Sequence, residues 1–155
     1  MNKMKILDVL HKEAIISDLK AVDKQGVLEE LVMPIASIAG LNQDYLVRVL
    51  MERERLGSTG IGEGVGIPHG KLKDLASLVL GFGLSRKGVD FESMDGQPTH
   101  IFFLLVTPEN STGLHLKLLA QISRILKNEF FRQKLMDAAN SDEIYSIIQE
   151  EEEEL

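Results

Sequence analysis

The chain has 155 residues, 44% hydrophobic and 26% charged, and its formal net charge is −7. This length and balance predict one compact domain with a hydrophobic core, and the negative charge argues against non-specific binding of nucleic acid. The sequence contains no cysteine, which excludes disulfides, thiolate metal ligands and a thiol nucleophile.

The first half of the chain alternates extended and helical patterns. An extended segment over 14–19 precedes a helix that Asp23 should cap and that should run to Ala39. Pro34 lies inside that helix and should kink or split it. A second helix is expected over 42–56. The apolar side of the first helix comprises Val27, Leu31, Ile35 and Ile38.

Strand patterns dominate the middle of the chain, and helical patterns follow them to the C-terminus. The turn "MDGQP" lies between the two longer strands, which should form the middle of a sheet. This alternation predicts the α/β class. The expected strands are 65–67, 76–85 and 99–108, and the expected helices are 112–126, 128–138 and 141–150.

Three segments of the sequence bear on the location of the protein and on the limits of its domain. Charged residues occupy the N-terminal segment where a signal peptide needs an apolar block, and the apolar run "IFFLLV" is too short to cross a bilayer. We therefore expect a cytoplasmic protein without direct membrane insertion. The domain should cover 1–149, and the acidic segment 150–155 should be a solvated tail, with contact to a basic partner as the alternative.

Two polar residues fall on helical stripes that are otherwise apolar. Arg53 stands seven positions after Leu46, and His115 begins a stripe that continues through Leu118 and Ile122. Each has a plain structural alternative. Arg53 suits the last turn of a helix, where the helix dipole favours a cation, and His115 suits a hydrogen-bonded place in the core.

The segment "GSTGIGEGVGIPHGK", residues 57–71, is unusually rich in glycine. Glycines allow positive φ and leave backbone N–H groups open to a ligand, yet the nucleotide signatures GxxxxGK[ST] and GxGxxG do not occur here. Pro68 and Gly70 should present His69 at the end of a strand, where ligand sites of open α/β sheets gather. The alternative is a glycine-rich turn with an incidental histidine.

Together these three side chains suit a phosphoryl group. Neutral imidazole is a good nucleophile near neutral pH, so His69 could accept the group. Arg53 could bind phosphoryl oxygens through its guanidinium fork, and His115, near the positive end of its helix, could donate a hydrogen bond to them.

The stretch "RERLGSTGIGEGVGIPHGK" resembles the active-site segment of the EIIA domains of the fructose/mannitol class, type 2, in the bacterial phosphoenolpyruvate-dependent sugar phosphotransferase system. The nitrogen-regulatory EIIA proteins belong to this class. An arginine stands sixteen positions before a proline-preceded histidine, and a second histidine lies well downstream. The similarity runs from "LKAVDKQGVLEELV" through "SMDGQP" to "LHLKLLAQISRIL" and leaves out only the acidic tail.

The resemblance implies a single domain with a mixed β-sheet flanked by helices on both faces, without metal or organic cofactor. It implies that His69 is the phosphorylated residue and that Arg53 and His115 complete the site. Arg53 is the arginine of an "RE" pair whose second residue is Glu54. The implied donor is HPr or its nitrogen-branch relative, and the implied acceptor or target is an EIIB domain or a regulatory protein. A rim of apolar residues and carboxylates should meet the basic donor.

Three functions remain open at this point. The first is a regulatory phosphocarrier of the nitrogen-regulatory type, which the "STGIGEGVGIPHGK" segment favours by resemblance. The second is the EIIA component of a fructose/mannitol-type sugar import system. The third is a zinc hydrolase built from His69, His100 and His115, although the sequence lacks an HExxH motif.

Overall fold

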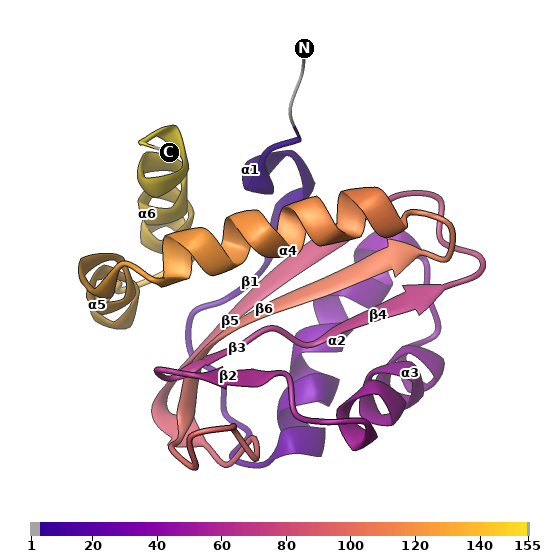
Figure 1. The fold of residues 1–155 in the computed structure, drawn as a ribbon, viewed down its shortest axis with the longest axis horizontal. Coiled ribbons are helices and arrows are strands. Elements are labelled where there is room, and N and C mark those ends of the chain that lie inside the picture. The colour runs from indigo at the N-terminus through magenta and orange to yellow at the C-terminus, as the bar shows by residue number, and fades with distance from the viewer. Residues whose placement is uncertain (1–3, 155) are drawn as a thin grey trace.

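Within residues 4–154, which the computed structural model describes, six strands form one mixed sheet with helices on both faces (Figure 1). The strand order is β1-β5-β6-β3-β2, and β4 pairs with β6 farther along the same edge as β3. The expected mixed sheet between two helical layers is confirmed. The strands are β1 (Leu10–Ile16), β2 (Gly60–Gly62), β3 (Val65–Gly66), β4 (His69–Leu72), β5 (Val79–Val89) and β6 (Thr99–Pro108).

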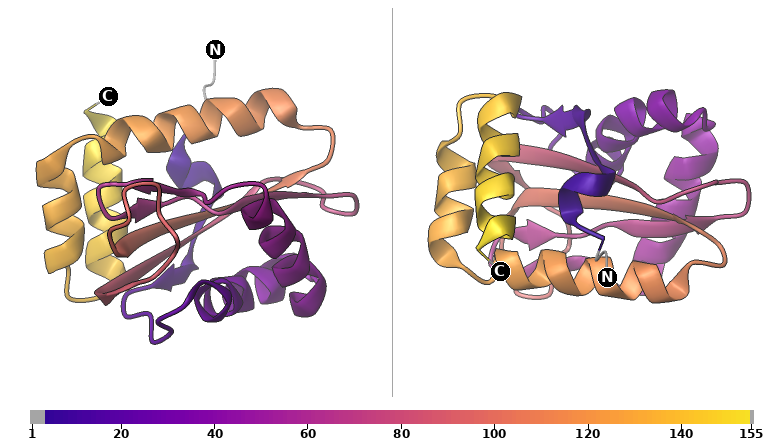
Figure 2. Two further views of the ribbon diagram at one scale, coloured as in Figure 1. Left: turned by 60° about the horizontal axis from the view of Figure 1, so that its bottom comes forward. Right: turned by 90° about the horizontal axis from the view of Figure 1, so that it is seen from above.

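The helices form two groups. Helices α2 and α3 cover one face of the sheet, and α1, α4, α5 and α6 cover the other (Figure 2). The expected caps are present, because Asp23 accepts from the backbone N–H of Gly26, and Asn42 accepts from that of Tyr45. The helices are α1 (Ile6–Val9), α2 (Lys24–Ala39), α3 (Gln43–Arg55), α4 (Thr112–Leu126), α5 (Glu129–Asp137) and α6 (Ser141–Glu153).

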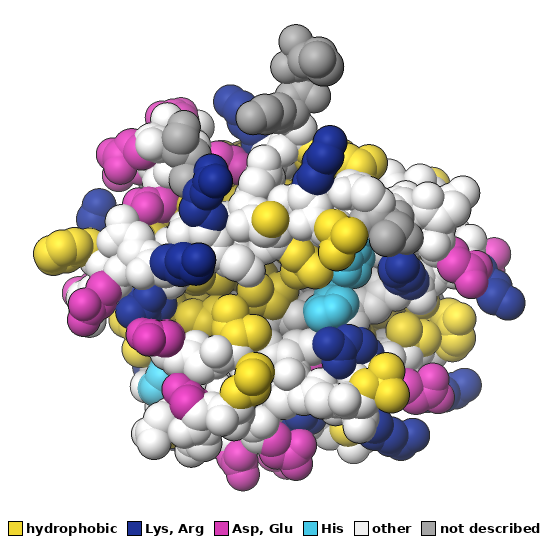
Figure 3. All heavy atoms as spheres, viewed as in Figure 1, with side chains coloured by type: hydrophobic (Ala, Val, Ile, Leu, Met, Phe, Trp, Pro, Cys, Tyr) yellow, Lys and Arg dark blue, Asp and Glu magenta, His cyan; other side chains and the backbone are white. Residues whose placement is uncertain are grey.

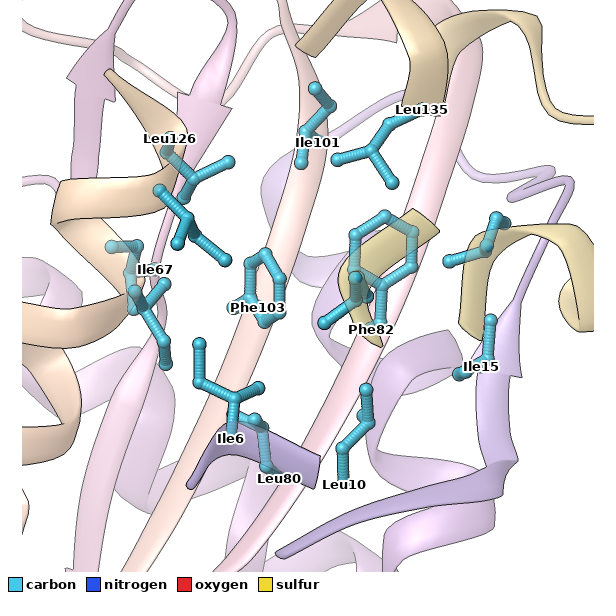
Figure 4. Close-up of a cluster of buried hydrophobic side chains, with 14 of the residues drawn as sticks. Ile6, Leu10, Ile15, Ile67, Leu80, Phe82, Ile101, Phe103, Leu126 and Leu135 are labelled. Carbon is cyan, nitrogen blue, oxygen red and sulfur yellow. The ribbon is translucent and has the colours of Figure 1, made fainter. Parts of the chain in front are cut away.

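The antiparallel pair β5 and β6 separates two hydrophobic cores, because alternate side chains of a strand point to opposite faces. On the α4 side, Phe82 and Phe103 pack edge to face with ring centroids 5.0 Å apart (Figure 4). On the α2 side, a Cβ on Gly83 would lie 2.6 Å from Leu31 Cδ2, so the missing side chain lets α2 approach the sheet.

Several expectations differ from the structure. Pro34 does not split α2, which runs unbroken from Lys24 to Ala39. Ile38 lies at the edge of the buried stripe in the last turn of α2 and is 37% exposed. The expected extended segment 14–19 begins earlier, as β1, and α1 precedes it.

The acidic residues 150–153 form the last turn of α6. Glu152 accepts hydrogen bonds from the backbone N–H groups of Ile6 and Leu7 at the start of α1. At least this glutamate is therefore a structural cap, which differs from the solvated tail that we expected. None of the helices in residues 4–154 has the length and hydropathy that a membrane-crossing helix needs.

Candidate active site

His69 is the first residue of β4, directly after Pro68, and pairs with Leu105 of β6. We expected it at the end of a strand. The strand β3 ends at Gly66, and His69 instead begins the next strand along the same edge. Its side chain is half-buried, while Gly70 behind it is fully packed against Val49 and Leu50 of α3.

A backbone contact fixes the ring of His69. Its Nδ1 lies 2.8 Å from the carbonyl oxygen of Ile67. A carbonyl oxygen only accepts hydrogen bonds, so Nδ1 carries the proton in this contact and Nε2 holds the lone pair. The nucleophilic atom of this imidazole is therefore Nε2.

His115 lies beside His69, as the sequence predicted. The two ring centroids are 5.3 Å apart, with an edge-to-face angle of 74°. His115 is only 6% exposed in the first turns of α4, and its Nδ1 lies 3.2 Å from the hydroxyl oxygen of Thr107 at the end of β6. Thr107 was not among the expected site residues, although it is the one polar residue that closes the apolar run of β6.

We had expected Arg53 to continue the buried stripe of α3, and it does not. The buried side chains are Leu46, Leu50 and Glu54, spaced by four residues, while Arg53 is half-buried beside them. Around the helix axis Arg53 and Glu54 lie on opposite sides of Leu50, about 60° and about 40° away, so Arg53 falls at the edge of the buried stripe. Its Nη1 donates a hydrogen bond of 2.9 Å to the carbonyl oxygen of Gly57.

Both histidines are biased toward the neutral state. Burial is the main cause that lowers the pKa of His69, the contact with the Ile67 carbonyl opposes it, and the nearby positive charge of Arg53 lowers it further. Burial also lowers the pKa of His115, with smaller contributions from His69 and Lys71. Near neutral pH, both rings are therefore uncharged, which keeps the lone pair of His69 available.

The site opens onto one face of the protein. Figure 3 shows histidine side chains at the surface, between apolar side chains and Lys or Arg side chains. Leu114 and Leu116, which flank His115 in α4, are 41% and 60% exposed. The apolar rim agrees with our expectation, but in this view Lys or Arg side chains adjoin the histidines in place of the carboxylates that we expected (Figure 3).

His100 does not join the other two histidines. It stands five residues before Leu105 on β6, and its Nδ1 lies 2.8 Å from the carbonyl oxygen of Ser85. Its ring packs beside Gly88, near the far end of β5. The three histidines of the zinc alternative therefore do not meet, and the described part of the chain gathers no three potential ligands suited to a metal ion.

The family model described as "Phosphoenolpyruvate-dependent sugar phosphotransferase system, EIIA 2" matches residues 8–151. The chain belongs to this family. It is a phosphotransferase-system EIIA protein of type 2, a component of a phosphoryl-transfer system, as its resemblance had implied.

Relatives of this EIIA protein carry names of two kinds. A nitrogen regulatory protein of Bradyrhizobium diazoefficiens is 41% identical over 145 residues, which cover 94% of this chain and 95% of that protein. The fructose-specific EIIABC component of the phosphotransferase system of Bacillus subtilis is 36% identical over 146 residues, which span only 23% of its length.

Solved structures agree on the fold. The crystal structure of the nitrogen regulatory protein IIA-Ntr from Neisseria meningitidis superposes with a TM-score of 0.86 at 31% identity, covering 91% of this chain and 97% of that one. Mannitol EIIA in its complex with phosphorylated mannitol EIIB from Escherichia coli superposes with a TM-score of 0.78 at 19% identity, over 92% of this chain and 99% of that one. This second likeness concerns the fold alone.

Proposed function

We propose that this EIIA protein carries a phosphoryl group on Nε2 of His69 and accepts it from the phosphohistidine of an HPr-like phosphocarrier. The observation that carries the proposal is the pairing of Nδ1–H with the Ile67 carbonyl, which leaves Nε2 unprotonated beside His115. The family membership supports the reaction class. No metal or organic cofactor takes part in the proposed step.

The transfer balances without a net movement of protons. The lone pair on Nε2 of His69 forms the new N–P bond, the N–P bond of the donor phosphohistidine breaks, and its electron pair returns to the donor imidazole. His69 keeps its Nδ1–H, and the positive charge that develops on its ring is stabilised by the hydrogen bond to Ile67. The donor ring returns to the neutral state.

Arg53 and His115 supply the charge stabilisation that phosphoryl transfer requires. One guanidinium nitrogen of Arg53 is engaged with Gly57, and its other N–H groups serve the phosphoryl oxygens. If Thr107 donates its hydroxyl proton to Nδ1 of His115, the ring keeps a proton on Nε2 and donates it to the same oxygens.

We propose a regulatory role of the nitrogen-regulatory type, with sugar import as the alternative. The regulatory reading is supported by the 41% identity to a nitrogen regulatory protein over nearly all of both chains. The alternative is supported by the fructose-specific relative, and the fold likeness to a mannitol EIIA in complex with its EIIB suggests an acceptor of that kind. The target is then a regulatory protein or an EIIB domain. All these steps belong in the cytoplasm and involve neither nucleic acid nor membrane insertion.

The proposal is tested by incubating the protein with phosphoenolpyruvate, Enzyme I and either HPr or its nitrogen-branch relative, followed by intact mass measurement. We expect the mass to increase by one phosphoryl group, acid-labile and alkali-stable, in wild type and in His100→Ala, and not in His69→Ala. Persistent labelling of a folded His69→Ala protein, or an acid-stable phosphoserine at Ser58, contradicts the assignment.

A second experiment separates regulation from transport. Unphosphorylated protein and His69→Ala should capture a common partner that the phosphorylated form releases or binds differently, because phosphorylation adds about −1.5 to −2 charges at the site. If a deletion strain instead loses uptake of one sugar, restored only by protein with His69, and transfer to an EIIB domain is fast, the transport alternative is correct.

A further inference from the structure

Glu54 is a buried charge next to the site that the proposed mechanism does not use. It lies in the last turn of α3, directly after Arg53, and its side chain is 2% exposed. Burying a carboxylate is costly unless it is paired and hydrogen-bonded. Glu54 must therefore be judged by the groups that it binds.

One of these groups is the turn that precedes β2. The backbone N–H of Thr59 donates a 3.0 Å hydrogen bond to Oε1 of Glu54, and the hydroxyl of Thr59 donates to Oε2. Thr59 itself is 4% exposed. Both oxygens of Glu54 thus bind a single residue of the glycine-rich segment and fix it against the end of α3.

The other group is Lys24 at the start of α2. Its Nζ lies 3.0 Å from Oε1 of Glu54 and 3.1 Å from Oε2 of Glu92, and the Lys24 side chain is 11% exposed. The ammonium also lies 4.9 Å from the centroid of the Phe91 ring. Lys24 therefore compensates the charge of Glu54 and ties three separate segments together.

A continuous path of hydrogen bonds leads from Glu54 to the imidazole of His69. Beyond Thr59, the carbonyl oxygen of Thr59 accepts from the N–H of Ile67 at 3.0 Å. The carbonyl oxygen of Ile67 then accepts from Nδ1 of His69 at 2.8 Å. The position of the Ile67 carbonyl, and with it the tautomer of His69, thus depends on where Glu54 holds Thr59.

The same turn also holds Arg53. The carbonyl oxygen of Gly57, which accepts from Nη1 of Arg53, lies two residues before Thr59, and the N–H of Gly57 donates to the carbonyl oxygen of Glu54 at 3.0 Å. A displaced turn would therefore move both the nucleophile and the guanidinium.

We propose that Glu54, compensated by Lys24, is a positioning residue that holds Thr59 so that His69 presents Nε2 and Arg53 keeps its place beside it. Glu54 does not touch the phosphoryl group. This inference rests on the proposed function for its kinetic test, but its test by NMR spectroscopy requires no donor protein.

The variants are Glu54→Gln and Thr59→Val, with Thr59→Ser as the conservative partner and Glu52→Gln as the control. Glu52 is exposed on the same helix, so its substitution removes one negative charge without touching the turn. In phosphoryl transfer from a saturating HPr-like donor, we expect kcat to fall by up to about 100-fold in Glu54→Gln and Thr59→Val, the loss that a displacement of roughly 1 Å can cause. The KM for the donor should stay near the wild-type value, and Thr59→Ser and Glu52→Gln should transfer normally.

The second readout is the ring of His69 in ¹⁵N-edited NMR spectra of the unphosphorylated protein. Wild type should show the Nδ1–H tautomer, and Glu54→Gln should show a mixture of tautomers. The pKa of His69 should also fall in Glu54→Gln, because the charge of Glu54 raises it in the wild type. A residue that only stabilised the fold would leave the tautomer of His69 unchanged in a folded variant, whereas the fall in the pKa follows from the lost charge alone.

The outcomes test the proposed function and the positioning role of Glu54 separately. Absence of phosphorylation in wild type overturns the proposed function, while the tautomer measurement still decides the role of Glu54. Normal transfer and an unchanged His69 tautomer in folded Glu54→Gln overturn the positioning role. If Glu54→Gln fails to fold, Thr59→Val, which leaves the ion pair with Lys24 intact, decides in the same way.

Discussion

The ring of His69 is held by the carbonyl oxygen of Ile67, only two residues earlier, at 2.8 Å from Nδ1. Pro68 lies between them and restricts the backbone to the extended conformation that this short loop needs. The contact assigns the reactive nitrogen, and it leads directly to the first prediction.

Phosphorylated protein should carry its phosphoryl group on Nε2 of His69, because Nδ1 is occupied by its hydrogen bond to Ile67. NMR spectra that correlate ring ¹⁵N with ³¹P distinguish the two isomers. Unphosphorylated wild type supplies the reference spectrum, and a group on Nδ1 would mean that the Ile67 contact breaks before transfer.

Arg53→Lys should slow transfer by roughly one to three orders of magnitude, because lysine keeps the charge but loses the planar fork that binds two oxygens at once. The measurement is the rate of phosphorylation by a saturating donor. Arg55→Lys, an exposed neighbour on α3, is the matched control. Equal rates in both variants would leave Arg53 with only its helix-end role.

The rate of transfer should fall as the pH is lowered through a pKa below the ordinary histidine value of about 6.5. The inflection should lie below the ordinary value because burial lowers the pKa of His69. The neutral and reactive ring therefore persists to lower pH than in a peptide. In His115→Asn the transfer rate should be lower at every pH, but its dependence on pH should remain. An inflection above the ordinary histidine pKa is incompatible with this picture.

Gly83→Ala should destabilise the protein by about 1–3 kcal/mol, the usual cost of overpacking. The added Cβ would lie 2.6 Å from a methyl group of Leu31 and 2.7 Å from one of Leu19. Urea unfolding measures the effect. Gly113→Ala is the control, because a Cβ there meets nothing within 4 Å. If Gly83→Ala were as stable as wild type, α2 would be able to shift without cost.

Glu152→Gln should lower the free energy of unfolding by about 1 kcal/mol, the typical worth of a helix cap. The carboxylate accepts from two N–H groups of α1, which the amide does less well. Glu153→Gln, exposed in the same turn, should have no measurable effect. Equal loss in both variants would point to the summed charge of the tail instead.

Long elements could be predicted from the sequence, whereas the short strands β2 and β4 could not. The helix 112–126 and the strand 99–108 have the bounds that the sequence predicted, because their apolar periodicity is long enough to define one face. The strands β2 and β4 have 3 and 4 residues, and their pairing depends on β3 and β6, which local sequence does not encode.

The same contrast holds for the site. His69 and His115 were predicted to act together, and their rings are in contact. Glu54 was missed as a buried residue because the helical stripe was drawn through Arg53, one position earlier. Lys24 is thirty positions away in sequence, so only the packing of α2 against α3 reveals that it compensates Glu54.

In the proposed transfer His69 keeps its Nδ1–H on the Ile67 carbonyl, so the nucleophile need not exchange a proton with solvent. The proposed step also breaks one N–P bond and forms another of the same kind, so we expect it to run in both directions. The fraction of molecules phosphorylated on His69 would then follow the phosphorylation level of the donor, and through the donor it would report the supply of phosphoenolpyruvate.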